Sequence, residues 1–216
     1  LAVFTFHQRR LAARDGSPLI NLALFRVRSF SAGVVTNVAF QMMMASFFLV
    51  LALYLQDGRG LSALESGLIF LPLGLGYFAA SAASPRVAAR LGRQVLALGA
   101  LVITGGYLLL AATSGDGTGW LIPGLVIAGC GMGFAVAPMP SIVLAGVKPD
   151  HAAAASGVVS TAQQAGNAIG IGVIGVIFYH ALGAGAYPHA FTLALVAMAA
   201  LGVLGAALVQ LFPRRP

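Results

Sequence analysis

The stretch ASGVVSTAQQAGNAIG, residues 155–170, lies within a run from Ala152 to Pro213 that contains no Asp, Glu, Lys or Arg. A hydrocarbon core about 30 Å thick is crossed by roughly 20 residues of helix, so this run is long enough for two membrane spans. The segment HALGAGAYPHA (180–190), with its glycines and proline, is the natural turn between them. The run therefore predicts that the chain crosses a membrane.

The rest of the chain repeats this pattern. Of 216 residues, 59% are hydrophobic and 8% are charged, and the mean hydropathy is +0.95. Four more uncharged runs occupy 29–56, 66–85, 94–115 and 117–147. Strands of a membrane barrel would alternate in polarity over about 10 residues, and these runs do not. The sequence predicts an all-α membrane protein, a six-transmembrane-helix bundle in residues 29–213, with spans near 32–55, 65–84, 94–113, 120–146, 153–179 and 190–212.

The net charge of +7 is unevenly placed along the chain. If the six spans alternate in direction, eleven basic residues lie on one side of the membrane and only Arg59 lies on the other. This asymmetry is a strong positive-inside signal. Both chain ends are then predicted to be cytoplasmic, in a bacterial inner membrane, and the basic excess indicates topology rather than nucleic-acid binding. The basic residues on the predicted cytoplasmic side are Arg9, Arg10, Arg14, Arg26, Arg28, Arg86, Arg90, Arg93, Lys148, Arg214 and Arg215.

The chain ends favour a piece of a longer protein. Residues 1–28 begin without Met, lack the charged start of a signal peptide, and resemble the end of an earlier apolar segment followed by a basic cytoplasmic linker; residues 214–216 form a tail. The single Cys130 excludes an intrachain disulfide. No cluster has metal-ligand spacing, so we predict no metal, cofactor or catalytic residue.

Amide side chains in two spans are the candidate functional groups. In the first span, Asn37 and Gln41 continue into Met44 and Phe48 at helical spacing. A buried amide without a partner costs on the order of 1 to 3 kcal/mol, so these groups should face a wet cavity or a partner bundle rather than lipid. Packing explains Met44 and Phe48 equally well. In the fifth span the corresponding stripe is Ser156, Ser160, Gln164 and Asn167, with Gln163 beside it.

The fourth span contains GCGMGFAVAPMP, residues 129–140. A phosphate-binding loop would need a preceding strand and a following Lys-Ser/Thr, which are both missing. Gly129, Gly131 and Gly133, followed by Pro138, instead predict a helix that a neighbour approaches closely and that bends.

Two loop motifs flank the second span. Ser62 and Glu65 have the spacing of a helix-capping box, and we prefer that role over proton transport because the pair lies at the membrane boundary. Arg90, Gly92 and Arg93 form an R-x-G-R turn after the span. These arginines either mark topology alone or bond helix ends or a facing acidic group and so hold one conformation.

These residues together resemble the C-terminal half of a major facilitator superfamily transporter. LINLALFRVRSF (19–30), YLQDGRGLSALESGLIFLP (54–72) and the stretch 155–170 look like its fourteen-helix drug:proton antiporter branch, the EmrB/QacA type. The family loop pattern G-x-x-x-D-R-x-G-R-[RK] is degenerate here, with Pro85, Ala89 and Gln94 at its glycine, aspartate and last basic positions. The resemblance implies that spans one and four line a central cavity, two and five meet a missing N-terminal half, and three and six support from outside.

The function implied is one half of a proton-coupled multidrug efflux antiporter working by alternating access. The substrate would be a small organic compound, cationic or amphipathic, contacted by Asn37, Gln41, Met44, Phe48, Gln164 and Asn167. An importer of a small metabolite on the same scaffold remains open, as does a fragment without independent transport. An intramembrane serine protease is excluded, because Ser156 and His180 would lie about 35 Å apart on one helix.

Overall fold

A computed structural model describes residues 28–144, 147 and 151–210. The predicted linker up to residue 27, the tail 214–216 and the loop residue Lys148 lie outside these ranges. The described chain is helical. Its elements are α2 (Arg28–Leu53), the π-helix η2 (Tyr54–Gly58), α3 (Ala63–Leu91), α4 (Gln94–Ala112), the short 3-10 helix η3 (Thr118–Trp120), α5 (Leu121–Val136), α6 (Met139–Leu144), α7 (Ala152–Ala184) and α8 (Tyr187–Val209).

The prediction of six spans is confirmed, because six helical segments of the described chain are long and apolar enough to cross a membrane. Three of them extend beyond the predicted spans at both ends: Phe30–Gly58, Ala63–Leu91 and Ala152–Gly183. The helix α3 continues through Pro85 to Leu91, and α7 reaches Ala184, which leaves Gly185 and Ala186 as the turn before α8. Backbone groups in hydrocarbon must be satisfied within the helix, which favours continuing it to the boundary.

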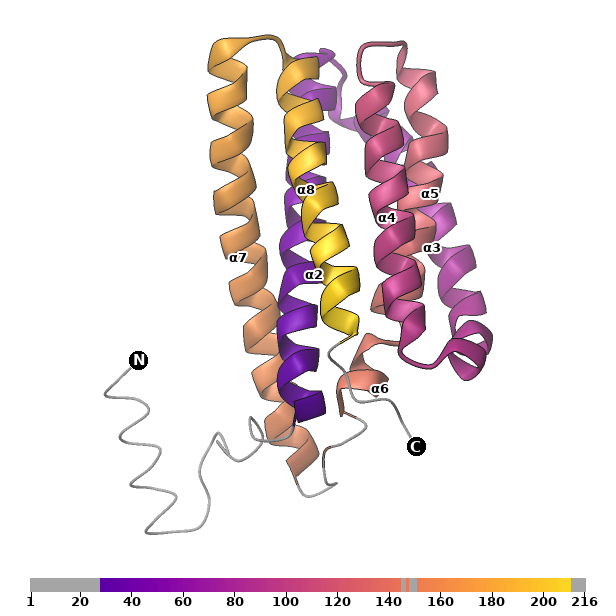
Figure 1. Ribbon diagram of the computed structural model, residues 1–216. Coiled ribbons are helices and arrows are strands. Elements are labelled where there is room, and N and C mark those ends of the chain that lie inside the picture. Colours follow the sequence, from indigo (N-terminus) through magenta and orange to yellow (C-terminus); the bar gives the residue numbers. More distant parts are fainter. Residues whose placement is uncertain (1–27, 145–146, 148–150, 211–216) are drawn as a thin grey trace, which may run out of the picture.

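The helices form two groups of three (Figure 1). The helix α5 packs against both α3 and α4, and α2 packs against both α7 and α8. Contacts between α4 and α8 join the two groups. The two middle helices, α2 and α5, therefore each hold a group together, so their residues set the spacing of the bundle.

Glycines let α5 approach two neighbours at once. A Cβ on Gly129 would lie 2.1 Å from the carbonyl oxygen of Leu73 in α3, whereas a Cβ on Gly131 would lie 2.5 Å from the backbone nitrogen of Ile103 in α4. Gly133 meets α3 again, at 2.5 Å from the carbonyl oxygen of Tyr77. Alternate glycines thus face opposite neighbours. The α-helix then stops at Val136, and the short α6 follows a turn that contains Pro138.

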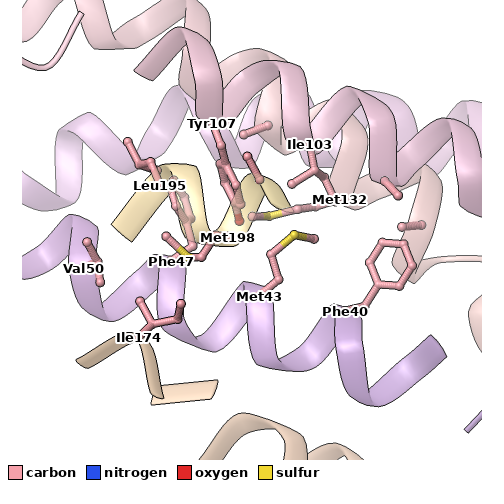
Figure 2. Packing of buried hydrophobic residues seen from close by; sticks show 14 of the residues in the cluster. Phe40, Met43, Phe47, Val50, Ile103, Tyr107, Met132, Ile174, Leu195 and Met198 are labelled. Atoms are coloured by element: carbon pink, nitrogen blue, oxygen red, sulfur yellow. The ribbon is translucent and has the colours of Figure 1, made fainter. Parts of the chain in front are cut away.

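Aromatic and methionine side chains fill the space between the two groups (Figure 2). The ring of Tyr107 in α4 stacks on Phe47 in α2, with centroids 4.7 Å apart and planes at 24°. Met43, Met132 and Met198 bring flexible thioethers from α2, α5 and α8 into the same buried cluster. Methionine adapts to irregular gaps, so this cluster fills the interface between the two groups of helices by apolar packing.

One end of the bundle is fastened by a set of contacts that we call the Arg59 clamp: Tyr54, Arg59, Ser114 and Phe191. The Arg59 side chain donates through Nε to the Tyr54 hydroxyl and through Nη2 to the Ser114 carbonyl oxygen, each at 2.8 Å, and also to the Asp116 carbonyl oxygen. The Tyr54 hydroxyl donates to the same Ser114 oxygen, and its ring stacks on Phe191 at 4.1 Å. The clamp joins η2, the loop after α4, and α8.

A second polar contact joins α4 and α8 at the opposite end, which we call the Arg93 end. The amides of Gln94 and Gln210 bond each other in both directions, at 3.0 and 3.1 Å. At the end of the bundle that holds the Arg59 clamp, which we call the Arg59 end, the predicted capping box of α3 is confirmed: Ser62 accepts from the Glu65 backbone, and the Glu65 carboxylate accepts from Ser62. Polar bonds therefore fix the ends of the bundle while apolar packing fills its middle.

Candidate functional site

The predicted stripe on α2 changes from buried to open along the helix. Asn37 is 3% exposed, Gln41 and Met44 are half-buried, and Phe48 is 40% exposed. The Phe48 ring stacks on Phe70 of α3, with centroids 5.9 Å apart and planes at 14°. This aromatic pair spans the gap between the two groups of helices, so the open end of the stripe is an apolar wall shared by α2 and α3.

The buried end of the stripe carries two unpaired polar atoms. The Asn37 Oδ1 and the Oγ1 of its fully buried neighbour Thr36 have no hydrogen-bond partner among the described residues. Each such atom costs free energy in an apolar surrounding. Thr36 was not predicted as a site residue, because a single threonine in an apolar span gives no periodic signal. These two unpaired atoms lie in the half of α2 that is predicted to be nearer the cytoplasm.

Glycines set the register between α2 and α7. A Cβ on Gly166 would lie 3.0 Å from the Val38 carbonyl oxygen, and one on Gly170 would lie 2.4 Å from that of Met42. Both pairs advance by one turn, so the two helices run in the same direction in close contact. Residues near 37–41 of α2 therefore lie at about the same depth as residues near 165–169 of α7.

The amides of α7 flank this contact. Asn167 is half-buried and its Nδ2 donates to the Oε1 of the exposed Gln164 at 3.2 Å. Ser160 is exposed, and Ser156 donates to the carbonyl oxygen of Ala153 one turn back. Together with the α2 residues at the same depth, these amides form a group that we call the amide band: Asn37, Gln41, Gln164 and Asn167.

The amide band offers hydrogen bonds without charge. The described carboxylates all lie at the Arg59 end: Asp57 in η2, Glu65 in the first turn of α3 and Asp116 in the loop after α4. Among the described residues no group of three or more His, Cys, Asp or Glu side chains is placed to hold a metal ion. The chemistry available at the band is therefore recognition by amide donors and acceptors beside methionine and aromatic surfaces.

The R-x-G-R turn joins α3 to α4 at the Arg93 end. Gly92 has φ +55°, and its N–H donates to the Ala88 carbonyl oxygen at 2.8 Å, which ends α3. A positive φ favours glycine at this position. Arg90 is exposed, whereas Arg93 is half-buried just before α4 begins. The described part of the chain places no carboxylate against either arginine.

Comparison with known proteins identifies the family. The family model of the Major Facilitator Superfamily matches residues 5–171. This chain belongs to the Major Facilitator Superfamily. The predicted family, a transporter superfamily with six-helix halves, is thereby confirmed, together with the membrane-protein fold.

The relatives of this superfamily member include proteins named for drug transport. It is 34% identical over 189 residues to the probable actinorhodin transporter of Streptomyces coelicolor, an alignment that covers 85% of this chain and 33% of the relative. It is 26% identical over 180 residues to the multidrug resistance protein Stp of Mycobacterium tuberculosis, covering 83% and 34%. It is 27% identical over 167 residues to the multidrug efflux pump LfrA of Mycolicibacterium smegmatis, covering 76% and 33%. The chain thus spans about one third of the length of these relatives.

Proposed function

We propose that this chain is the C-terminal six-helix half of a multidrug efflux transporter. The amide band, flanked by Met44 and the Phe48–Phe70 pair, is the observation that carries the proposal. The names of the relatives, which include a multidrug efflux pump, support export as the direction of transport and drugs as the substrate class. The substrate is a small amphipathic or cationic organic compound, since soft apolar groups and neutral amides suit loosely specified ligands.

In this proposal the amide band lines one wall of a central cavity, and a second bundle supplies the other wall. Interhelical amide bonds are worth only about 0.6 to 2 kcal/mol each, which is weak enough to break and reform as the halves rock. The amide band contains no carboxylate, so we assign the proton-carrying group to another part of the transporter. We place the protein in the bacterial inner membrane with both ends of this chain cytoplasmic, from the distribution of its arginines.

Asn37→Leu tests the site. In a full-length transporter that contains this segment, we expect the variant to be as stable as the wild type or up to about 2 kcal/mol more stable, because an unpaired buried amide is removed. In the proposal the buried Asn37 amide becomes accessible to the substrate as the halves rock, so efflux of a fluorescent cation should nevertheless fall at least about tenfold, the factor that one good hydrogen bond contributes. Fluorescence of preloaded cells and a thermal unfolding curve give the two readouts.

Val35→Leu is the matched control, because Val35 lies half a turn away on α2 and is 54% exposed. Its efflux should be unchanged. Unchanged efflux in Asn37→Leu would contradict the site, and greater accumulation of the cation in cells expressing the wild type would contradict export in favour of import.

The 216-residue chain alone should not transport. The amide band forms a single wall, and alternating access needs two bundles that move against each other. We expect no flux of the fluorescent cation above empty vesicles when this chain is reconstituted with an imposed proton gradient, whereas a full-length transporter gives flux. Proton-linked flux from the isolated chain would refute its assignment as a half.

A further inference from the structure

We propose that the Arg93 end of α4 holds the headgroup phosphate of an anionic phospholipid. The proposal starts from the Arg93 side chain, which is half-buried. Its Nη1 is covered by protein atoms and has no hydrogen-bond partner among the described residues. A partly desolvated guanidinium without an acceptor is costly, so an anion at the accessible edge of this group would be stabilising.

The anion does not come from the described part of this chain. Its three carboxylates, Asp57, Glu65 and Asp116, lie at the Arg59 end, on the other side of the bundle. The first turn of α4 contains no acidic residue to offset the positive end of the helix dipole. Arg86 and Arg90, one turn apart near the end of α3, are exposed and add positive charge beside Arg93. Among the described residues, this corner of the bundle is therefore cationic and has no counter-ion.

Neighbouring apolar residues favour a lipid over a soluble phosphate. Leu91, between the arginines, is 44% exposed. Along α4 the exposed positions Leu98, Leu101 and Leu108 follow at helical spacing, at 36%, 55% and 49% exposure. Acyl chains lying along this stripe would bring a headgroup to the level of Arg93, because the stripe begins within two turns of the start of the helix.

The headgroup should carry a net negative charge. Phosphatidylcholine also contains a phosphate, but its choline cation neutralises that phosphate and competes with the guanidinium. A phosphatidylglycerol phosphate has no such partner and matches the planar donor fork of arginine. Basic residues at the membrane surface favour anionic lipids by a factor of about five each.

The test measures lipid retained by the 216-residue chain. The chain is purified with an equimolar mixture of phosphatidylglycerol and phosphatidylcholine, and the bound lipids are counted by native mass spectrometry. We expect phosphatidylglycerol to be retained about fivefold over phosphatidylcholine by the wild type, and the ratio to fall to about one in Arg93→Gln. Arg86→Gln removes a positive charge from an exposed position near Arg93, and this variant should keep more than half of the preference for phosphatidylglycerol.

Three results would overturn the proposal. A wild-type ratio near one means that the site does not select anionic lipid. An equal loss in Arg86→Gln and Arg93→Gln means that diffuse surface charge, rather than the Arg93 site, attracts the lipid. Displacement of the lipid by millimolar glycerol 3-phosphate means that a soluble phosphate is the ligand. If circular dichroism shows that Arg93→Gln does not fold, Arg93→Lys replaces it in the test. Its ratio of phosphatidylglycerol to phosphatidylcholine should lie between the wild-type value and one, because lysine keeps the charge but loses the donor fork. A ratio equal to that of the wild type would count against the site.

Discussion

Replacing Gly129 by alanine is expected to lower the free energy of unfolding of the bundle by about 3 kcal/mol. The added Cβ would lie 2.1 Å from the Leu73 carbonyl oxygen, and backbone cannot yield as a flexible side chain does. The helices α3 and α5 must therefore move apart along their whole contact, which loses dispersion contacts that drive association of helices in lipid. Denaturant unfolding in micelles, followed by circular dichroism, measures the change.

Gly105→Ala is the control for this variant. Gly105 lies in α4, and a Cβ there would meet nothing within 4 Å. Alanine should be neutral or stabilising by up to about 1 kcal/mol, since glycine is the poorer helix former. Equal effects of Gly129→Ala and Gly105→Ala would show that the α3–α5 contact is looser than the structure has it.

Replacing Arg59 by glutamine is expected to destabilise the bundle by about 2 kcal/mol. The guanidinium donates to the carbonyl oxygens of Ser114 and Asp116 and to the Tyr54 hydroxyl, and a shorter neutral amide cannot reach all three. The loop after α4 should separate from η2 as a result. Hydrogen exchange of residues 113–117 should rise in this variant, and the thermal midpoint should fall.

A double-mutant cycle with Tyr54→Phe separates the parts of the Arg59 clamp. Removing the hydroxyl alone should cost about 1 kcal/mol. The double variant should lose less than the sum of the single losses, because the two side chains share the Ser114 carbonyl oxygen. Strict additivity would mean that Tyr54 and Arg59 act independently, which the shared acceptor contradicts.

Periodicity and charge predicted much of this protein without coordinates. Long apolar runs require helices in hydrocarbon, so the six spans followed from length and composition. The capping box at Ser62 and Glu65 is a local motif whose geometry depends on a spacing of three residues, and the structure contains it as predicted. The positions of the amides on common helix stripes also followed from spacing alone.

Contacts between helices distant in sequence were beyond such reasoning. Arg59 stood out only as a lone charge, and its partners Ser114 and Asp116 could not be inferred because no local pattern joins them. Nor did the sequence show that Asn37 is buried beside an unpaired Thr36 while Phe48, on the same stripe, reaches Phe70 of α3. Burial of one stripe changes along a helix when its neighbours cross it at an angle.

The sequence by itself determined that this chain crosses a membrane as helices, where those helices carry amides, and which family it resembles. These properties depend on the solvent and on spacings within one helix, both of which are written in consecutive residues. Only the tertiary structure decided which glycine of α5 meets which neighbour, how α2 and α7 bring their amides to one depth, and what Arg59 holds. Those outcomes depend on the packing of surfaces from separate segments, where shifts of an ångström decide which atoms touch.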